Sequence, residues 1–316
     1  MKEQERIAIE IFSEYGLDFK TATRAGGWTN AVWLNGDIAL RLSFKKDSDR
    51  IRREVRLSEH LPEEVGYPVN IAVGFMDGYE WSLSKRIYGN NLSEIWSSLD
   101  WKERTVAIRQ ILRIMELAHK VDISKIEDLS NKRAWYSSFN PQETYSCLER
   151  YKAEKIFSDE QIGVFYGILE RFWEKHNSAT AVLNHGDITT DNLLWSNGII
   201  VSLMDFEHSV IAAPELDLQN VFNLAFFSEE GDYIINHNLQ ESLQYKEDVI
   251  EMLKPMLANS DSTDLILGYA FLYRQRFLEF WLENPEGKLE EQDAYIKLLS
   301  LANGKGGYLL EILKDN

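Results

Sequence analysis

The sequence predicts an α+β fold, in which a small five-stranded antiparallel part precedes a larger, mostly helical part. Residues 18–87 contain short strand-like runs separated by two strong hairpin signals, Asn35-Gly36 and Asp77-Gly78. From Leu92 onward, apolar residues recur at the spacing of amphipathic helices. A chain of 316 residues with 44% hydrophobic content is large enough for two domains.

The N-terminal part begins with a helix, because residues 3–15 carry apolar side chains at helical spacing. A second helix is expected between the cap residues 47–49 and Pro62, which ends it. The five strands are expected at residues 19–24, 31–34, 37–44, 70–75 and 79–87. The resulting order is three strands, a helix and two strands.

The C-terminal part is predicted to consist of long helices. The clearest runs are residues 101–121, 142–152, 159–176 and 261–282. Residues 181–204 are an exception, because short apolar runs alternate there with turn residues. The character of the sequence changes near Gly89, so we predict two domains, residues 1–89 and 90–316.

The charge of the chain is strongly negative and unevenly distributed. Against 34 Lys and Arg there are 51 Asp and Glu, a net charge of −17. Residues 1–89 hold 13 basic and 14 acidic residues, which leaves a net of −16 for the remainder. Nucleic-acid binding requires basic surface, so we expect no nucleic-acid partner.

We expect a soluble, cytoplasmic protein without a membrane partner. The single Cys147 excludes an intrachain disulfide and fits a reducing compartment, although a disulfide-free secreted protein would look the same. The N-terminal residues lack the apolar core of a signal peptide, and no apolar run approaches the roughly 20 residues that span a bilayer. The sequence does not indicate the oligomeric state.

Three oxygen-bearing side chains lie on closely spaced segments of the strand-like region. Asp187 and Asn192 are five residues apart, between two short apolar strands, and a turn and return strand lead to Asp205. Phosphoryl transfer requires an acid that orients a hydroxyl, and oxygen ligands for magnesium. The alternative is that Asp187 and Asn192 cap turns and that His185 is an ordinary loop histidine.

The pattern His185-Gly186-Asp187, Asn192 and then Asp-Phe-Glu at 205–207 resembles the catalytic segment of the aminoglycoside phosphotransferase and choline kinase family. Residues 214–218, Pro-Glu-Leu-Asp-Leu, are similar to a downstream element of that family. The resemblance covers most of residues 18–225, and beyond that range only the helical character matches.

This family comprises small-molecule kinases with a two-lobed, protein-kinase-like fold. The resemblance implies a nucleotide-binding lobe at 1–89, a catalytic and substrate-binding lobe at 90–316, and Mg²⁺ with ATP or GTP as cofactors. It implies that Asp187 orients and deprotonates the acceptor hydroxyl and that His185 braces the loop. Asn192 and Asp205 would bind magnesium.

The resemblance also assigns nucleotide-binding residues in the N-terminal part. Gly26 and Gly27 lie at a strand turn, where backbone N–H groups can approach a phosphate, although an ordinary hairpin is the alternative. Glu54 is placed like the family's partner of a strand lysine, but this chain has Arg41 at the matching position. An arginine can bind two phosphate oxygens and still pair with Glu54. The alternative is a purely structural ion pair.

Ser84 and Arg86 fall where the family has the hinge between its lobes, whose backbone binds the purine. Only nine positions separate Asp205 from Pro214, too few for the activation loop of a protein kinase. Gly186 stands where a protein kinase has the arginine that binds the phosphate of its activation loop. We therefore expect a small-molecule acceptor and constitutive activity.

The acidity of the C-terminal part favours a cationic acceptor, such as an aminoglycoside or a choline-like amine. Candidate regions are the acidic stretch 217–230 and a late helix whose aromatic residues could contact an ammonium group. The predicted substrate-binding residues are Glu207, Asp217, Glu279, Trp281 and Glu283. The alternatives are a solvated acidic surface, aromatics that belong to the core, and a macrolide or sugar acceptor.

Two other functions fit parts of the pattern. A metallohydrolase would bind a transition metal through His185, Asp187, Asp205 and His208, but it leaves the N-terminal strands without a role. A non-catalytic nucleotide-binding protein on the same scaffold would fit the replacement of lysine by Arg41.

Overall fold

The computed structural model describes residues 3–27, 29–126, 140–226, 239–257 and 260–303. The chain forms two compact units, and neither is one continuous piece of sequence. The first unit comprises Met1–Ile95, Val121–Ser130 and Thr190–Glu207. The second comprises Trp96–Lys120, Asn131–Thr189 and His208–Asn316. The predicted domain boundary at residue 89 stays a prediction.

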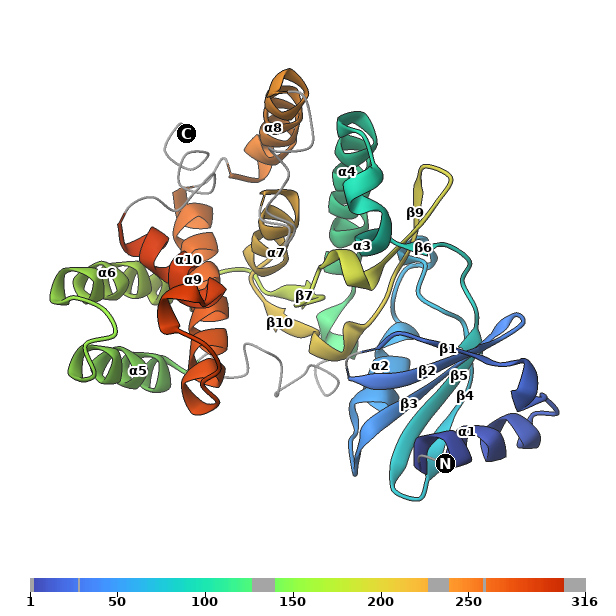
Figure 1. The fold of residues 1–316 in the computed structure, drawn as a ribbon. Coiled ribbons are helices and arrows are strands. Elements are labelled where there is room, and N and C mark those ends of the chain that lie inside the picture. The colour runs from blue at the N-terminus through green and yellow to red at the C-terminus, as the bar shows by residue number, and fades with distance from the viewer. Residues whose placement is uncertain (1–2, 28, 127–139, 227–238, 258–259, 304–316) are drawn as a thin grey trace. The chain divides into compact units, whose positions relative to one another are not determined.

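The first unit is built on a five-stranded antiparallel sheet, as the α+β fold class predicts (Figure 1). Its strand order is β1-β2-β3-β5-β4, which leaves β4 at one edge. The strands are β1 (Thr23–Ala25), β2 (Asn30–Asn35), β3 (Ile38–Lys46), β4 (Asn70–Met76) and β5 (Tyr79–Lys85).

Both predicted hairpins are present. Asn35 pairs with Ile38 and Met76 pairs with Tyr79, so each hairpin has a two-residue loop. In the second loop Asp77 and Gly78 both have positive φ, 53° and 87°, as a tight primed turn requires. In the first, the loop residues are Gly36 and Asp37, one position later than the Asn-Gly signal suggests.

The predicted first strand, residues 19–24, is partly wrong. Phe19–Thr21 forms a 3-10 turn, and β1 begins only at Thr23. The physical reason is a cap, because the Asp18 carboxylate accepts a hydrogen bond from the backbone N–H of Lys20 at 3.0 Å. Such a local bond gives the backbone an alternative to the sheet.

Helix α1 (Glu3–Glu14) covers one face of the sheet (Figure 1). Its residues Ile7, Ile11 and Phe12 are fully buried and form a core with strand residues such as Leu40 and Leu83. Burial of such side chains contributes roughly 1.5–3 kcal/mol each. The predicted leading helix is confirmed.

Helix α2 (Arg50–Ser58) is positioned by a carboxylate from the sheet. Asp49 precedes the helix but makes no side-chain cap bond. Instead the fully buried Glu80 of β5 accepts from the backbone N–H of Ile51 at 3.1 Å and from Arg52 Nε at 2.8 Å. A carboxylate is stabilising at a helix N-terminus. This contact fixes the helix that carries Glu54.

The first unit also contains a three-stranded sheet of order β6-β8-β9. These strands are β6 (Asn90–Asn91), β8 (Leu193–Ser196) and β9 (Ile199–Leu203), with the short helix α3 (Leu92–Ile95) beside them. Asn197 and Gly198, at φ 51° and 83°, form the tight turn between β8 and β9. The hairpin therefore returns the chain toward its starting point.

In its described residues the second unit is mostly helical and contains one two-stranded pair, β7 (Val182–Asn184) with β10 (Val210–Ala212). Its helices are α4 (Trp101–His119), α5 (Pro141–Ala153), α6 (Asp159–His176), α7 (Glu215–Phe226), α8 (Leu239–Leu253), α9 (Ser260–Glu283) and α10 (Asp293–Ala302).

The four clearest predicted helices are confirmed as α4, α5, α6 and α9. Capping boxes mark the starts of α4 and α6, where Asp100 pairs with Glu103 and Ser158 pairs with Gln161. Helices α6 and α9 lie side by side (Figure 1), and an added Cβ at Gly268 would meet the Phe172 ring at 2.1 Å. Across the described ranges, no helix combines the length and apolar character that a membrane crossing requires.

Candidate functional site

In the second unit, the loop that carries Asp187 follows directly from strand β7. Asn184, the last residue of β7, pairs with Val210 of β10 and donates through Nδ2 to the carbonyl of Ala212 at 3.0 Å. The strand pair thus fixes the point where the loop begins. Asp187 is half-buried on this loop.

The buried carboxylate of Asp217 holds the backbone of this loop. Asp217 lies in the first turn of α7 and is 0% exposed. Its two oxygens accept from the backbone N–H groups of His185 at 2.8 Å and Gly186 at 2.9 Å. His119 Nε2 lies 3.1 Å from the same carboxylate. Hydrogen bonds to an ionised carboxylate are roughly twice as strong as neutral ones, so the loop conformation is well defined.

Gly186 is required by the backbone. Its φ is +82°, a region that residues with a Cβ rarely adopt. A Cβ there would also lie 2.4 Å from the carbonyl oxygen of His208. The backbone conformation of the loop therefore requires a glycine at this position, where a protein kinase would have a phosphate-binding arginine.

The fully buried His185 contacts the backbone of the loop that it was predicted to brace. Its Nδ1 accepts a hydrogen bond from the backbone N–H of Asp187 at 3.2 Å. This contact assigns the ring proton to Nε2 when the imidazole is neutral. A bracing role for His185 needs such a contact, and it stays a prediction.

In the first unit, Asn192 and Asp205 occupy the open end of the β8–β9 hairpin. Leu193 pairs with Leu203, and the backbone N–H of Met204 donates to the carbonyl of Asn192 at 2.9 Å. Asn192 just precedes β8, and Asp205 follows two residues after β9. Asp205 has a φ of 66°, which is uncommon for a residue with a side chain and is found at functional sites.

Asn192 and Asp205 fit a magnesium ion by the chemistry of their donors. Magnesium prefers oxygen ligands and is usually held by one or two protein groups together with waters and substrate phosphates. An amide oxygen and a carboxylate meet that requirement. The side chain of Asp205 is 32% exposed, whereas Asn192 is largely buried.

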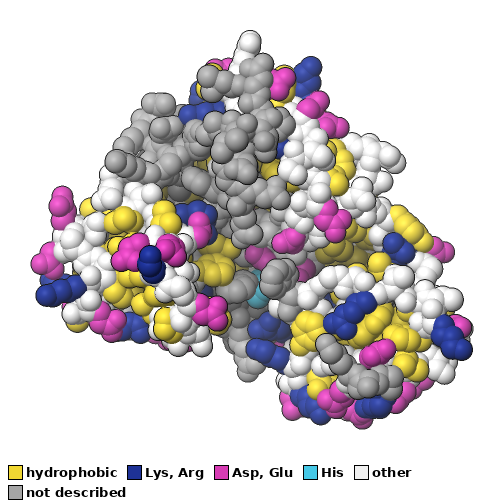
Figure 2. Space-filling model, in the orientation of Figure 1, with side chains coloured by type: hydrophobic (Ala, Val, Ile, Leu, Met, Phe, Trp, Pro, Cys, Tyr) yellow, Lys and Arg dark blue, Asp and Glu magenta, His cyan; other side chains and the backbone are white. Residues whose placement is uncertain are grey.

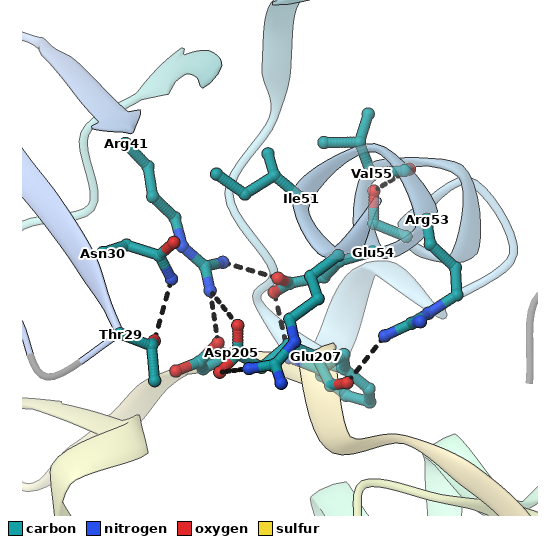
Figure 3. Close-up of polar contacts among 12 residues, drawn as sticks. Thr29, Asn30, Arg41, Ile51, Arg53, Glu54, Val55, Asp205 and Glu207 are labelled. Atoms are coloured by element: carbon teal, nitrogen blue, oxygen red, sulfur yellow. Dashed lines mark hydrogen bonds and ion pairs between the residues drawn. The ribbon is translucent and has the colours of Figure 1, made fainter. Parts of the chain in front are cut away.

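Arg41 connects three carboxylates of the first unit (Figure 3). Its Nη1 donates to Glu54 Oε2 at 2.5 Å, and its Nη2 lies 2.5 Å from Asp205 Oδ1 and 3.4 Å from Glu207 Oε2. The structure therefore brings together the predicted residues Arg41, Glu54 and Asp205, although 164 positions separate the first from the last.

Burial and charge oppose one another in this cluster. Burial lowers the pKa of Arg41, but the charges of Asp205, Glu54 and Glu207 outweigh it, so the pKa lies well above its usual value. Burial raises the pKa of the Glu54 carboxyl; Arg41 opposes this shift, and Asp205 and Glu207 add to it. Arg41 is the cation that pairs with all three carboxylates and so compensates the cost of burying them.

Glu54 is fixed through both of its oxygens. Besides Arg41, it accepts from the Tyr67 hydroxyl at 2.9 Å and from the backbone N–H of Phe206 at 2.9 Å. The second bond ties helix α2 directly to the segment that carries Asp205. The predicted ion pair is thus also a link between two parts of the first unit.

Glu207 was predicted to bind substrate, but the structure buries it in the carboxylate cluster around Arg41. It is 1% exposed. In addition to Arg41, Arg50 Nη1 lies 3.6 Å from its Oε1, and Arg53 donates to its backbone carbonyl at 2.8 Å (Figure 3). These contacts favour a structural role over a direct contact with an acceptor.

The two glycines of the β1–β2 connection differ in their surroundings. Among the described residues, nothing lies within 4 Å of a Cβ added at Gly26, whereas a Cβ at Gly27 would lie 2.3 Å from the Asn30 carbonyl oxygen. Packing alone therefore explains a glycine at position 27, whereas no close contact with a described residue requires one at position 26. The phosphate-binding role of both stays a prediction.

We expect Gly27→Ala to lower the free energy of unfolding by about 1–3 kcal/mol, because the added methyl overpacks the turn. The matched control Gly26→Ala should change it by less than about 0.5 kcal/mol. Urea unfolding of the two variants measures the difference. Equal effects at both positions would contradict the close contact with Asn30.

The predicted hinge residues lie at the end of β5. Ser84 pairs with both neighbouring strands, through Ala39 and Asn70. The backbone N–H of Arg86 donates to the Asp37 carbonyl at 2.7 Å, and its guanidinium lies over the Tyr88 ring at 4.7 Å. A purine at Arg86 would therefore have to use the carbonyl oxygen of this residue.

The remaining predicted substrate-binding residues, Glu279, Trp281 and Glu283, all lie in the last turns of α9. Glu279 pairs with Arg150 of α5, and Trp281 Nε1 donates to the Glu286 carbonyl at 2.8 Å. Glu283 is exposed. Residues 227–230 of the predicted acidic stretch lie outside the described residues. On the face drawn in Figure 2, acidic side chains are interspersed with basic ones, as in a solvated surface.

The metallohydrolase alternative receives no support from the side chains. Within the described part of the chain, no three His, Cys, Asp or Glu side chains gather into a group that could hold a metal ion. His208 is buried next to β10, and His185 bonds to the backbone of Asp187.

Sequence patterns did not identify several residues that shape the site. Arg50, Arg53 and Tyr67 contact Glu207 or Glu54, but nothing in the local sequence marks these contacts. The only available signal was the run of arginines in Arg50-Ile-Arg-Arg-Glu-Val-Arg56, unusual in an acidic chain. His119 of α4 likewise gave no signal for its contact with Asp217.

A family model described as the phosphotransferase enzyme family matches residues 20–249. A comparison with curated proteins found no match. Among solved structures, aminoglycoside 2'-phosphotransferase-IIIa is similar at 14% identity and a TM-score of 0.65, covering 96% of this chain and 99% of the other.

Two further structures show the same likeness. APH(4)-Ia has 14% identity and a TM-score of 0.60, with 98% of this chain and 99% of the other covered. APH(2'')-Ib has 15% identity and a TM-score of 0.60, with 97% and 99% covered. These likenesses confirm the predicted two-lobed, kinase-like α+β fold.

Proposed function

This chain belongs to the phosphotransferase enzyme family, and we propose that it transfers the γ-phosphate of ATP or GTP to a hydroxyl of a small, cationic molecule. The proposal rests mainly on the position of Asp187, on a loop whose backbone is held in place. Its loop is locked through two backbone bonds to Asp217, and the chain then runs directly to Asn192 and the hairpin that ends at Asp205.

In this proposal Asp187 accepts a hydrogen bond from the acceptor hydroxyl, orients it toward the phosphate and takes up its proton. Asn192 and Asp205 hold Mg²⁺, which supplies charge neutralisation on the phosphates when bound. Arg41 offers N–H groups to phosphate oxygens, and Glu54 orients it. Asp217 acts on the reaction only through the loop that it holds.

The nucleotide is left as ATP or GTP because the similar structures support both. The aminoglycoside 2'-phosphotransferase-IIIa structure is a GDP complex, and the APH(2'')-Ib structure is ADP-bound. The cytoplasmic location and a role in antibiotic resistance are further parts of the proposal.

A cationic acceptor is supported by the charge of residues 90–316, a net of −16, which attracts cations through its summed field. The APH(4)-Ia structure is a ternary complex with ADP and hygromycin B. The predicted acceptor residues Glu279, Trp281 and Glu283 remain candidates. A macrolide or metabolic sugar is the alternative acceptor, and a non-catalytic nucleotide-binding protein is the alternative function.

A coupled assay of ADP and GDP release tests the proposal with the purified full-length chain and Mg²⁺. The panel should include aminoglycosides, choline analogues, macrolides and sugars, each with ATP and with GTP. We expect release above the no-acceptor rate for a cationic acceptor and none with EDTA present. Turnover only with an uncharged acceptor would overturn the acceptor class. A thermal shift with Mg-nucleotide but no turnover on any compound would favour the non-catalytic alternative.

A further inference from the structure

Arg41 occupies the centre of a carboxylate cluster in the first unit. Its guanidinium lies 2.5 Å from both Glu54 and Asp205 and 3.4 Å from Glu207. Glu54 and Glu207 are each 1% exposed. Three carboxylates this close repel one another strongly unless a cation lies between them. The Arg41 guanidinium contacts all three carboxylates (Figure 3), and Arg50 lies near Glu207 as a second cation.

The fork of an arginine suits this position better than a lysine ammonium would. Nη1 donates a hydrogen bond to Glu54, while Nη2 donates to Asp205 and Glu207. With its amide oxygen turned toward Arg41, Asn30 accepts from Nε at 3.0 Å and from Nη2 at 2.9 Å. A lysine presents one compact charge and cannot make separate, directed bonds to four groups.

The bond from Nη2 to Asp205 places Arg41 in competition with a metal ion. A carboxylate oxygen that accepts from a guanidinium is less available as a ligand, and the positive charge of Arg41 repels a divalent cation at the same carboxylate. The two cations would share one ligand. Binding of the metal therefore requires that Nη2 finds another partner.

We propose that Arg41 is a counter-ion of Asp205 that suppresses metal binding in the nucleotide-free protein. When nucleotide binds, its phosphates accept the hydrogen bond from Nη2, and the Asp205 carboxylate becomes available to the metal. Metal and nucleotide then bind with strong positive coupling. The inference rests on the proposed function, because it takes Asp205 as a metal ligand and Arg41 as a phosphate contact. Arg41 is thus a residue that makes the metal site depend on nucleotide.

The first test measures Mn²⁺ binding to the full-length protein without nucleotide, by the loss of the free-ion signal in electron paramagnetic resonance. Mn²⁺ is suitable because oxygen sites accept it in place of Mg²⁺. Arg41→Gln should bind Mn²⁺ at least tenfold more tightly than the unaltered protein. Arg41→Gln with Asp205→Asn should lose that gain, because the released ligand is gone.

Two further variants separate release of Asp205 from a change in charge. Arg41→Gln with Glu54→Gln keeps the net charge of the cluster and avoids an unpaired buried carboxylate at Glu54, so it also guards against misfolding of the single variant. It should still bind Mn²⁺ more tightly than the unaltered protein. The control Arg24→Gln removes an exposed arginine over Trp33 and should not alter Mn²⁺ binding.

The second test measures coupling between the ligands. ADP should tighten Mn²⁺ binding by a larger factor in the unaltered protein than in Arg41→Gln, because only the former must release Asp205. Unchanged Mn²⁺ affinity in both Arg41 variants, or equal coupling, would overturn the inference while leaving phosphotransfer intact. Absence of turnover on every acceptor, with the Mn²⁺ gain observed, would instead overturn the proposed function.

Discussion

Asp187→Asn is expected to lower the rate of phosphoryl transfer by about 10²–10⁴-fold, the range that a general base contributes. An asparagine keeps the size and polarity of the side chain but cannot take up the hydroxyl proton. The backbone bonds of the loop, from His185 and Gly186 to Asp217, do not involve the Asp187 carboxylate. The variant should therefore retain its fold and its affinity for nucleotide.

The measurement is kcat from nucleotide-diphosphate release, with thermal unfolding followed in parallel. Asp191→Asn is the matched control, because Asp191 lies in the same segment, is exposed, and uses its backbone carbonyl for the contact with Asn91. The control should keep its activity. Full activity in Asp187→Asn would remove the base from the mechanism.

Asp217→Asn is expected to lower the free energy of unfolding by about 3 kcal/mol, in the range for the loss of one partner from a buried charged network. The fully buried carboxylate accepts from the backbone N–H groups of His185 and Gly186 and lies next to His119. An asparagine has one acceptor oxygen in place of two, and its NH₂ group would face a donor.

Urea unfolding measures this loss. Asp159→Asn is a suitable control, because that aspartate also lies in the first turn of a helix but its side chain is 83% exposed. We expect the control to change stability by less than about 0.5 kcal/mol. The rate of phosphoryl transfer by Asp217→Asn should fall even at urea concentrations too low to unfold the protein, because the loop that carries Asp187 is released. Equal stability of both variants would show that Asp217 does not hold the loop.

The fold class was predictable because local signals agreed with the final structure. Two-residue hairpin loops and capping boxes act within a few residues, so the starts of α4 and α6 could be identified from the sequence. The 3-10 turn at Phe19–Thr21 is also local, but its cap by Asp18 competes with a strand-like apolar pattern. The pattern alone could not decide between them.

The residues alone suggested a candidate site where its members lie close together in sequence, whereas Arg41 and Glu54 were assigned through the family resemblance. His185, Asp187, Asn192 and Asp205 fall within 21 positions. In contrast, the acidic stretch suggested substrate binding for Asp217, whereas the structure buries this carboxylate against the backbone of the Asp187 loop. The contact of Glu207 with Arg50 joins segments more than 150 residues apart, and periodicity carries no information on such pairs.

The three-segment composition of the first unit sets an order of events during synthesis. Arg41 and Glu54 leave the ribosome long before Asp205, Glu207 and the backbone N–H of Phe206, which are their partners. The unit includes Thr190–Glu207, so it can complete its charge network only after residue 207 of 316 has emerged. Until then, the nascent sheet carries an incomplete ion cluster. Folding of the N-terminal strands is thereby tied to that of the β8–β9 hairpin, and these non-local contacts favour slow, late completion over independent early folding.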